Sequence, residues 1–383
     1  MFFTGLTILC GAQGKPAEDA GGDVLVLSNG DTLHGKLVSA IDGKVSFHSD
    51  PLGDLTVPWE KVKELHTAQK FALVDKSVKL NGKHEAKQVP VGTLAMADGA
   101  VTVRPEAAPA ASPIPVKDAP YIVNELTLNK QIFHEPGFFA GWDGAATAGA
   151  TLVKATQNQY TFAGGLGLVR VVPTAPWLNP RNRTSANFAG SYGKITEPAY
   201  RAGDVLVPAV VTKTAIYHLD GERDQYLSPR FFALAQTAFD HNFAQNLQLQ
   251  QIYGGGLGYT FLKSENQEAD LKGTVQYEKQ KFISAAPGTN QNLIGSTFSL
   301  SYLLQAKLLT YTQNLGYIPA YNNPHAYSAT ETNVITFPAY KNLGFSVGTI
   351  DSYLNGPPVS LPPTKRNSFQ FTMGFSYAIK SRY

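Results

Sequence analysis

The sequence predicts an all-β fold: an antiparallel transmembrane β-barrel of about 12 strands, with about 10 or 14 as alternatives, preceded by a small SH3-like or Sm-like β domain. Three observations predict it. After residue 137, long segments alternate apolar and polar residues; their polar positions hold mainly Gln, Asn, Thr, Ser and Gly; and aromatic residues gather near the segment ends. A soluble β-sandwich also alternates, but its outer surface usually carries more Lys and Glu.

The composition narrows the classes of protein to consider. Only 16% of the 383 residues are charged, against roughly 25% in an ordinary soluble domain, whereas aromatic residues make up 11%. The net charge of +3 argues against a nucleic-acid binder. No run of about 18 apolar residues occurs, so no transmembrane helix is predicted.

The segment 1–22 is predicted to be a signal-peptide remnant and leader. Its apolar run "MFFTGLTILCGA" resembles the central region of a secretory signal, and the small residues of Cys10-Gly11-Ala12 suit a cleavage site. Cys10 is the only cysteine of the chain. An exported protein without disulfides must be stabilised by a core or by closed strand pairing.

Residues 23–104 are predicted to form the small β domain, located in the periplasm. Short strand-like runs such as "KVSFHS" and "LTVPW" are separated by the Asn-Gly and Asp-Gly signals of tight hairpins. Trp59 is predicted to fill the core of this domain, with docking to a periplasmic partner as the alternative. The Ala/Pro-rich segment 105–136 is predicted to be a linker and lead-in to the barrel at 137–383.

The barrel region contains segments that each reach the roughly 9–11 residues a tilted strand needs to cross a bilayer. An even number of strands places both barrel ends on the same side of the membrane. The predicted strands are 138–154, 159–172, 183–196, 204–219, 226–240, 243–261, 268–283, 294–306, 309–319, 327–338, 341–353 and 367–380.

Alternation assigns the two faces of the barrel. In the last strand, the residues predicted to face lipid and to carry the signal read by the barrel-insertion machinery are Phe369, Phe371, Phe375, Tyr377 and the terminal Tyr383. The residues predicted to line the lumen are Gln248, Gln250, Thr297, Ser299, Gln370 and Thr372.

Five stretches, in the same order along the chain, resemble a known family: "LSNGDTLHGKLVS", "LTVPWEKVKELHT", "GFFAGWDGAATAGATL", "HLDGERDQYLSPRFFALAQTAFDHN" and "YGGGLGYTF". Together they are similar to the salt-induced outer-membrane proteins, a β-barrel family of unknown function. One departure is the first barrel hairpin, where the family often has Gly-Asn-Thr and this chain has "TQNQ". The resemblance implies an outer-membrane barrel and supplies no catalytic residues.

The chain offers little sign of catalysis or of a cofactor. Its eight histidines lack the spacing of a metal-binding motif, and no cofactor or metal is predicted. The acidic stretch "HLDGERDQ" is interpreted as a tight, charged periplasmic turn, with a cation site or acid/base pair as the alternative. Ser228 with His241 or His218 would be needed for a membrane-edge lipid hydrolase, the most distant of the functional alternatives, and no nucleophile motif surrounds Ser228.

The sequence therefore predicts a non-enzymatic protein in the outer membrane of a Gram-negative-type bacterium, in contact with outer-membrane lipid. The first hypothesis is a small passive pore. The alternative is a structural or docking protein whose barrel is filled by side chains and whose periplasmic β domain binds a protein partner. Nucleic acid is not predicted as a partner.

Overall fold

A computed structural model of the chain divides into two units, Met1–His134 and Glu135–Tyr383. It describes residues 22–75, 89–106, 109–133, 137–154, 158–175, 178–202, 204–264, 266–283, 290–355 and 366–381. The predicted signal segment up to residue 21 and the terminal Tyr383 lie outside the described residues.

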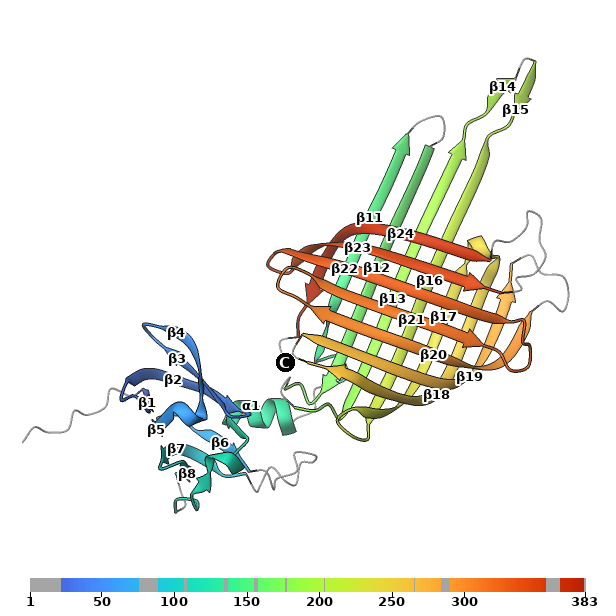
Figure 1. The fold of residues 1–383 in the computed structure, drawn as a ribbon. Coiled ribbons are helices and arrows are strands. Elements are labelled where there is room, and N and C mark those ends of the chain that lie inside the picture. Colours follow the sequence, from blue (N-terminus) through green and yellow to red (C-terminus); the bar gives the residue numbers. More distant parts are fainter. Residues whose placement is uncertain are drawn as a thin grey trace, which may run out of the picture. The chain divides into compact units, whose positions relative to one another are not determined.

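The N-terminal unit is a small, strongly curved sheet (Figure 1). Neighbouring strands run β1–β5–β7–β6–β10–β2, and pairing of β1 with β2 closes this ring; β3 and β4 continue from β2, while β8 and β9 extend from β7. The prediction of a small β domain before the barrel is confirmed. Its elements are β1 (Asp23–Leu27), β2 (Thr32–Ile41), β3 (Lys44–Ser49), β4 (Gly53–Pro58), η1 (Trp59–Lys61), β5 (Val62–His66), β6 (Phe71–Val74), β7 (Val91–Ala97), β8 (Ala100–Arg104), β9 (Ile114–Pro115), η3 (Val116–Asp118), β10 (Tyr121–Asn124), α1 (Glu125–Thr127) and η4 (Leu128–Phe133).

Local sequence explains the tight hairpin between β2 and β3. Asp42 and Gly43 have φ values of 46° and 80°, and Ile41 pairs directly with Lys44 on either side of them. Positive φ at both central residues matches the twist of the flanking strands and favours Asp-Gly at this turn.

The predicted linker is partly strand. Tyr121–Asn124 pair with both β2 and β6, and Ala119 is buried in the domain core. The sheet therefore extends into the segment 105–136 that composition alone had marked as a linker. Proline and alanine in that segment suit the short, irregular β9 and η3 that precede β10.

Trp59 lies in the core of this unit. Its side chain is 7% exposed and belongs to one apolar cluster with Phe47, Phe71 and Leu65. The indole thus contributes packing at the centre of the domain, and the docking role stays a prediction.

Asp23 ties three segments of the domain together. Its residue is 1% exposed, and its two carboxylate oxygens accept hydrogen bonds from the backbone N–H groups of Leu37 (2.6 Å) and Ala68 (2.7 Å). We expect Asp23→Ala to destabilise this domain by about 2–4 kcal/mol, because two amides lose their acceptor. Hydrogen–deuterium exchange at Leu37 and Ala68 should accelerate strongly in the alanine variant and less in Asp23→Asn; unchanged exchange at both amides would refute this role.

The C-terminal unit is a closed antiparallel barrel of twelve strands. The predicted fold class is therefore confirmed, and the twelve predicted strands correspond in order to the twelve strands of the barrel. The barrel strands are β11 (Trp142–Lys154), β12 (Asn158–Val172), β13 (Asn182–Glu197), β16 (Val210–Tyr226), β17 (Phe231–Asn242), β18 (Leu247–Lys263), β19 (Gln267–Phe282), β20 (Gln291–Gln305), β21 (Thr310–Pro319), β22 (Tyr327–Tyr340), β23 (Leu343–Leu354) and β24 (Asn367–Ile379).

The strands differ in length and in how they meet. β11, β12, β13 and β16 project beyond their neighbours, and the small β14–β15 hairpin (Tyr200–Ala202 and Val205–Val207) continues the connection from β13 to β16 (Figure 1). The short turn η5 (Phe243–Gln245) joins β17 to β18. Closure occurs between β11 and β24, where only Gly144–Ala148 pair with Phe375–Ile379.

The outer face of the barrel is apolar. In β24, Phe369, Phe371, Met373, Phe375 and Tyr377 are all more than half exposed. The same face continues around the barrel with exposed Leu271, Val275, Phe298 and Phe188, among others. None of the helices in the described part of the chain has the length and apolarity needed to cross a bilayer.

Candidate functional site: the barrel lumen

The lumen face follows from strand register. Directly paired residues of antiparallel strands project to the same side of a sheet. Arg183 of β13 pairs with Asp224 of β16 and also forms an ion pair with Asp270 of β19, which is not a neighbouring strand. Side chains of two strands on different sides of a closed barrel can meet only inside it. This face is therefore the lumen, and the face of Phe371 is the outside.

Arg183 organises the end of the lumen nearest the barrel's two chain ends. Its guanidinium donates from Nε to Asp224 (2.8 Å), and its terminal nitrogens donate to Glu268 and Asp270 (2.5 Å each). The Arg183 side chain is 14% exposed, and those of Asp224 and Asp270 are 1% and 3% exposed. A buried guanidinium held by three carboxylates is a charged cross-link between the two walls.

Two aromatic rings lie against the Arg183 cluster, and together they form a constriction of the lumen. The guanidinium carbon of Arg183 lies 5.4 Å from the ring centre of Phe232 and 5.9 Å from that of Tyr226, within the range of cation–π attraction. Phe232 is fully buried and lies over Gly258, where an added Cβ would be 2.3 Å from the ring. Glycine at 258 thus lets the phenyl ring occupy the lumen.

A second group of charged side chains lies next to the Arg183 cluster, further along the strands. Lys272 of β19 donates to Glu222 of β16 at 2.5 Å, with both side chains less than 15% exposed. Further along β16, His218 lies between two carboxylates, at 2.6 Å from Asp240 and 2.9 Å from Asp220. These contacts join β16 to β17 and, across the lumen, to β19.

Amides and hydroxyls fill the space along β17–β20. Gln236 donates to Thr274 (3.1 Å), and Thr297 donates to Gln276. Glu278, 3% exposed, accepts from Gln250 (2.6 Å) and from Gln280 (2.5 Å). This wall is a continuous polar network, closely packed rather than lined by free side chains.

The opposite wall is built from neutral residues, most of them small. On the lumen face of β11, β12 and β13 lie Ala145, Thr147, Ala163, Gly165 and Ser191. The lumen face of β22, β23 and β24 carries Thr332, Gly348, Ile350, Gln370 and Thr372. These residues are only half-buried, so solvent reaches them. The interior is therefore divided into a packed, charged wall and a more open, neutral wall.

The structure places five of the six predicted lumen residues on the lumen face: Gln250, Thr297, Ser299, Gln370 and Thr372. They do not come together in one cluster; the first two belong to the packed wall and the last two to the open wall. Gln248 differs, because the pairing of β18 with β19 shifts between Leu247 and Leu249 and the Gln248 side chain is exposed. The bulge turns Leu247 to the buried side, where strict alternation had put Gln248. The predicted lipid-facing residues of the last strand lie on the outer face: Phe369, Phe371, Phe375 and Tyr377. Tyr383 is outside the described residues.

The interpretation of "HLDGERDQ" as a turn is wrong. These residues lie within β16, where His218, Asp220, Glu222 and Asp224 alternate onto the lumen face. Sequence reasoning also missed Arg183, Glu268 and Asp270, whose contacts span strands far apart in the chain. The alternating charges of β16 were the available signal, since a strand with acidic residues at every second position needs a polar interior to face.

The structure does not bring together the residues that the hydrolase alternative requires. Ser228 lies in the connection from β16 to β17 and accepts from the backbone N–H of Phe231 (3.0 Å). His241 lies at the other end of β17, about 30 Å along the strand from Ser228, and is 2.7 Å from the backbone oxygen of Gln248. His218 is similarly distant and bound to two aspartates. Within the described ranges, no group of three or more His, Cys, Asp and Glu side chains is arranged to hold a metal.

The solved structures that resemble this chain include several bacterial outer-membrane proteins. A crystal structure of an outer-membrane channel from Pseudomonas putida F1 is 12% identical, with a TM-score of 0.35, covering 64% of this chain and 100% of that chain. The β domain of a Bordetella autotransporter is 10% identical (TM-score 0.30; 63% and 99% covered), and the channel DcaP of Acinetobacter baumannii is 8% identical (TM-score 0.28; 63% and 96% covered). At these identities and scores, no property of these proteins transfers to this chain.

Sequence comparison identifies the family of the barrel. No curated protein matches the chain. The family model described as "Protein of unknown function, DUF481" matches residues 146–379, which extend from β11 to the last residue of β24. Because this match covers more than half of the 383 residues and nearly the whole barrel, the chain belongs to the DUF481 family of proteins of unknown function.

Proposed function

We propose that this protein is an outer-membrane β-barrel that acts as a small passive pore for small cations, with its N-terminal β domain in the periplasm. The membrane placement is supported by the closed hydrogen-bonded barrel, which leaves no sheet edge unpaired in lipid, and by its apolar outer face. The even number of strands puts both ends of the barrel on the same side of the membrane, which supports a periplasmic position for the N-terminal domain.

The proposal that the pore favours cations rests on the charge of the lumen. β16, β17 and β19 present seven carboxylates to the lumen, whereas the permanently charged side chains buried among them are Arg183 and Lys272. Excess negative charge in a narrow, low-dielectric passage attracts cations and repels anions. The open wall of Thr372, Gly348 and Thr147 offers the path along which solvent reaches this charge.

A second function is favoured by one specific observation. Arg183, Phe232 and the Gln250–Glu278 network pack the charged wall so closely that several of its polar side chains are under 5% exposed. A barrel filled in this way would serve as a membrane anchor, and the N-terminal domain would bind a periplasmic protein. The resemblance to the salt-induced outer-membrane proteins, and recognition of Tyr383 by the insertion machinery, fit both functions and remain part of the proposal.

Current across a planar bilayer tests the pore. We expect the refolded chain, first shown to be heat-modifiable on a gel, to produce reproducible conductance steps. Gln370→Lys should shift selectivity toward anions, because it adds a cation to the open lumen wall. Ser368→Lys, two residues nearer the start of β24 and on the same face, should act in the same direction and more weakly.

A folded barrel that stays silent, with and without residues 23–136, would refute the pore and leave the anchor function. Conductance steps whose ion selectivity is unchanged in Gln370→Lys would show that the passage does not run along β24.

A further inference from the structure

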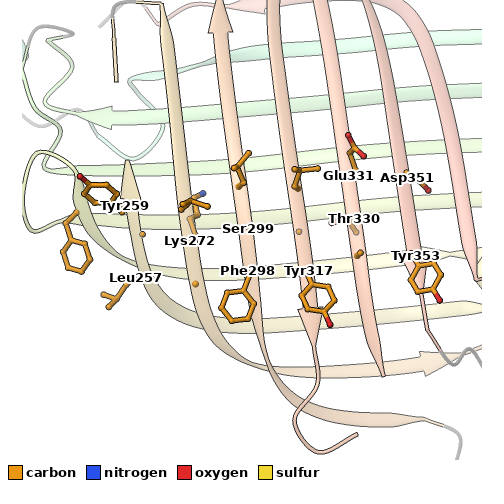
Figure 2. Close-up of a pocket in the computed structure, with 18 of the residues that line it drawn as sticks. Leu257, Tyr259, Lys272, Phe298, Ser299, Tyr317, Thr330, Glu331, Asp351 and Tyr353 are labelled. Carbon is orange, nitrogen blue, oxygen red and sulfur yellow. The ribbon is translucent and has the colours of Figure 1, made fainter. Parts of the chain in front are cut away.

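A groove of about 740 Å³ crosses the outside of the barrel from β17 to β24 (Figure 2). Register defines its two sides. One row of directly paired residues runs Tyr259, Leu271, Leu300, Leu315, Glu331 and Asp351; the other runs Leu257, Gly273, Phe298, Tyr317, Ala329 and Tyr353. Both rows continue into β24 on the side of Phe369, so the groove belongs to the outer face and not to the lumen.

Most of the groove is apolar. Leu257, Leu271 and Phe298 are each half exposed or more, and from β18 to β23 the groove extends about 24 Å, taking about 4.8 Å per strand. A single acyl chain spans only about half of the roughly 30 Å hydrocarbon core of a bilayer, so the groove is long enough for one extended chain. An extended acyl chain fits such a channel in both length and chemistry.

One end of the groove is acidic. Glu331 of β22 pairs directly with Asp351 of β23, an arrangement of like charges that is destabilising by itself. Glu331 Oε1 accepts from Asn333 (2.9 Å) and Gln313 (3.3 Å). Asp351 Oδ1 is buried and has no hydrogen-bond partner within the described part of the chain, where neither carboxylate forms an ion pair. The pair thus lacks a counter-charge, and Asp351 Oδ1 also lacks a donor.

Three tyrosines lie beside this acidic end. The ring centres of Tyr327 and Tyr353 are 5.8 Å apart, and those of Tyr317 and Tyr327 are 6.0 Å apart. Figure 2 shows Tyr317 and Tyr353 on one side of the groove and Glu331 and Asp351 on the other. Aromatic faces combined with carboxylates form the usual surroundings of a bound ammonium group.

We propose that this groove binds an amphiphile whose headgroup carries a primary ammonium and whose acyl chain lies along Leu315, Phe298 and Leu271 toward Leu257. The ammonium supplies the missing counter-charge to Glu331 and Asp351. A primary ammonium also donates N–H groups, which the unpartnered Asp351 Oδ1 requires and a quaternary ammonium does not have. In lipid, an uncompensated carboxylate pair would be unfavourable, so the bound headgroup stabilises this part of the wall.

Native mass spectrometry of the refolded chain in detergent tests the site without reference to conductance. The probes are phosphatidylethanolamine, phosphatidylcholine and phosphatidylglycerol with the same acyl chains. We expect the ethanolamine lipid to be retained about tenfold more than the other two, in keeping with a charge-assisted hydrogen bond to a buried carboxylate. The double variant Glu331→Gln, Asp351→Asn keeps the shape of both side chains and should abolish the preference.

Asp204→Asn is the matched control, because Asp204 is an exposed carboxylate in the β14–β15 connection and should leave the preference unchanged. Tyr353→Leu keeps the groove apolar and should weaken retention through loss of the ring. Equal retention of the three lipids, or an unchanged preference in the double variant that still shows heat-modifiable folding, would overturn the proposal.

Discussion

Replacing Arg183 with alanine is expected to enlarge the conductance step and to increase the preference for cations. The guanidinium crosses the lumen between Asp224 on one wall and Glu268 and Asp270 on the other. Its removal takes away the side chain that bridges the two walls and leaves three carboxylates without their cation. The barrel should also lose about 3–5 kcal/mol of stability, as expected when one partner of a buried ion pair is removed.

Two further variants separate the constriction from a general effect of losing an arginine. Arg223 lies next to Asp224 in β16 but on the outer face, where it donates to Thr184 at 2.6 Å. Arg223→Ala should leave the conductance step unchanged. Arg183→Lys keeps the charge but not the planar fork of donors, so it should give an intermediate step. An unchanged step in Arg183→Ala would contradict the role of this cluster as a constriction of the lumen.

Gly374→Ala is expected to impair closure of the barrel. A Cβ built at Gly374 would lie 2.1 Å from the backbone oxygen of Ala148, and one at Gly149 would lie 2.2 Å from the backbone oxygen of Met373. The seam between β11 and β24 has only five directly paired residues on each strand, so the loss of even one pair would weaken it strongly. We expect a destabilisation of about 3 kcal/mol and a smaller heat-modifiable fraction after refolding.

Gly273→Ala provides the matched control, since a Cβ there would meet nothing closer than Phe298 at 3.9 Å. This variant should refold like the unmodified chain. Equal refolding of the two alanine variants, read as the ratio of folded to unfolded bands on a gel, would show that the seam tolerates a side chain at residue 374.

Several elements of the fold could be predicted because their signal is local. The last strand shows the period of two over its whole length, and its boundaries, 367–380, lie within one residue of Asn367–Ile379. The Asp42-Gly43 hairpin follows from the turn preference of two residues. The end of β16 was predicted seven residues too early, because Asp-Gly within "HLDGERDQ" resembles a turn. In the closed barrel, pairing with β13 on one side and β17 on the other overrides that preference.

The site was harder to predict because its contacts are not local. Glutamine and threonine positions on the lumen face follow from alternation, as for Gln370 and Thr372. Alternation fails at Gln248, where a bulge in β18 inserts one residue and exchanges the two faces. The Arg183 cluster depends on which walls lie opposite each other across the lumen, and strand order and register decide this only after the barrel closes.

The reversal potential of the unmodified protein in a planar bilayer, measured under a salt gradient, tests the account most directly. An acidic lumen with a solvent-accessible neutral wall predicts conductance steps with a reversal potential on the cation-selective side. Anion-selective steps, or a folded barrel that conducts nothing, would contradict the proposal that this barrel passes small cations.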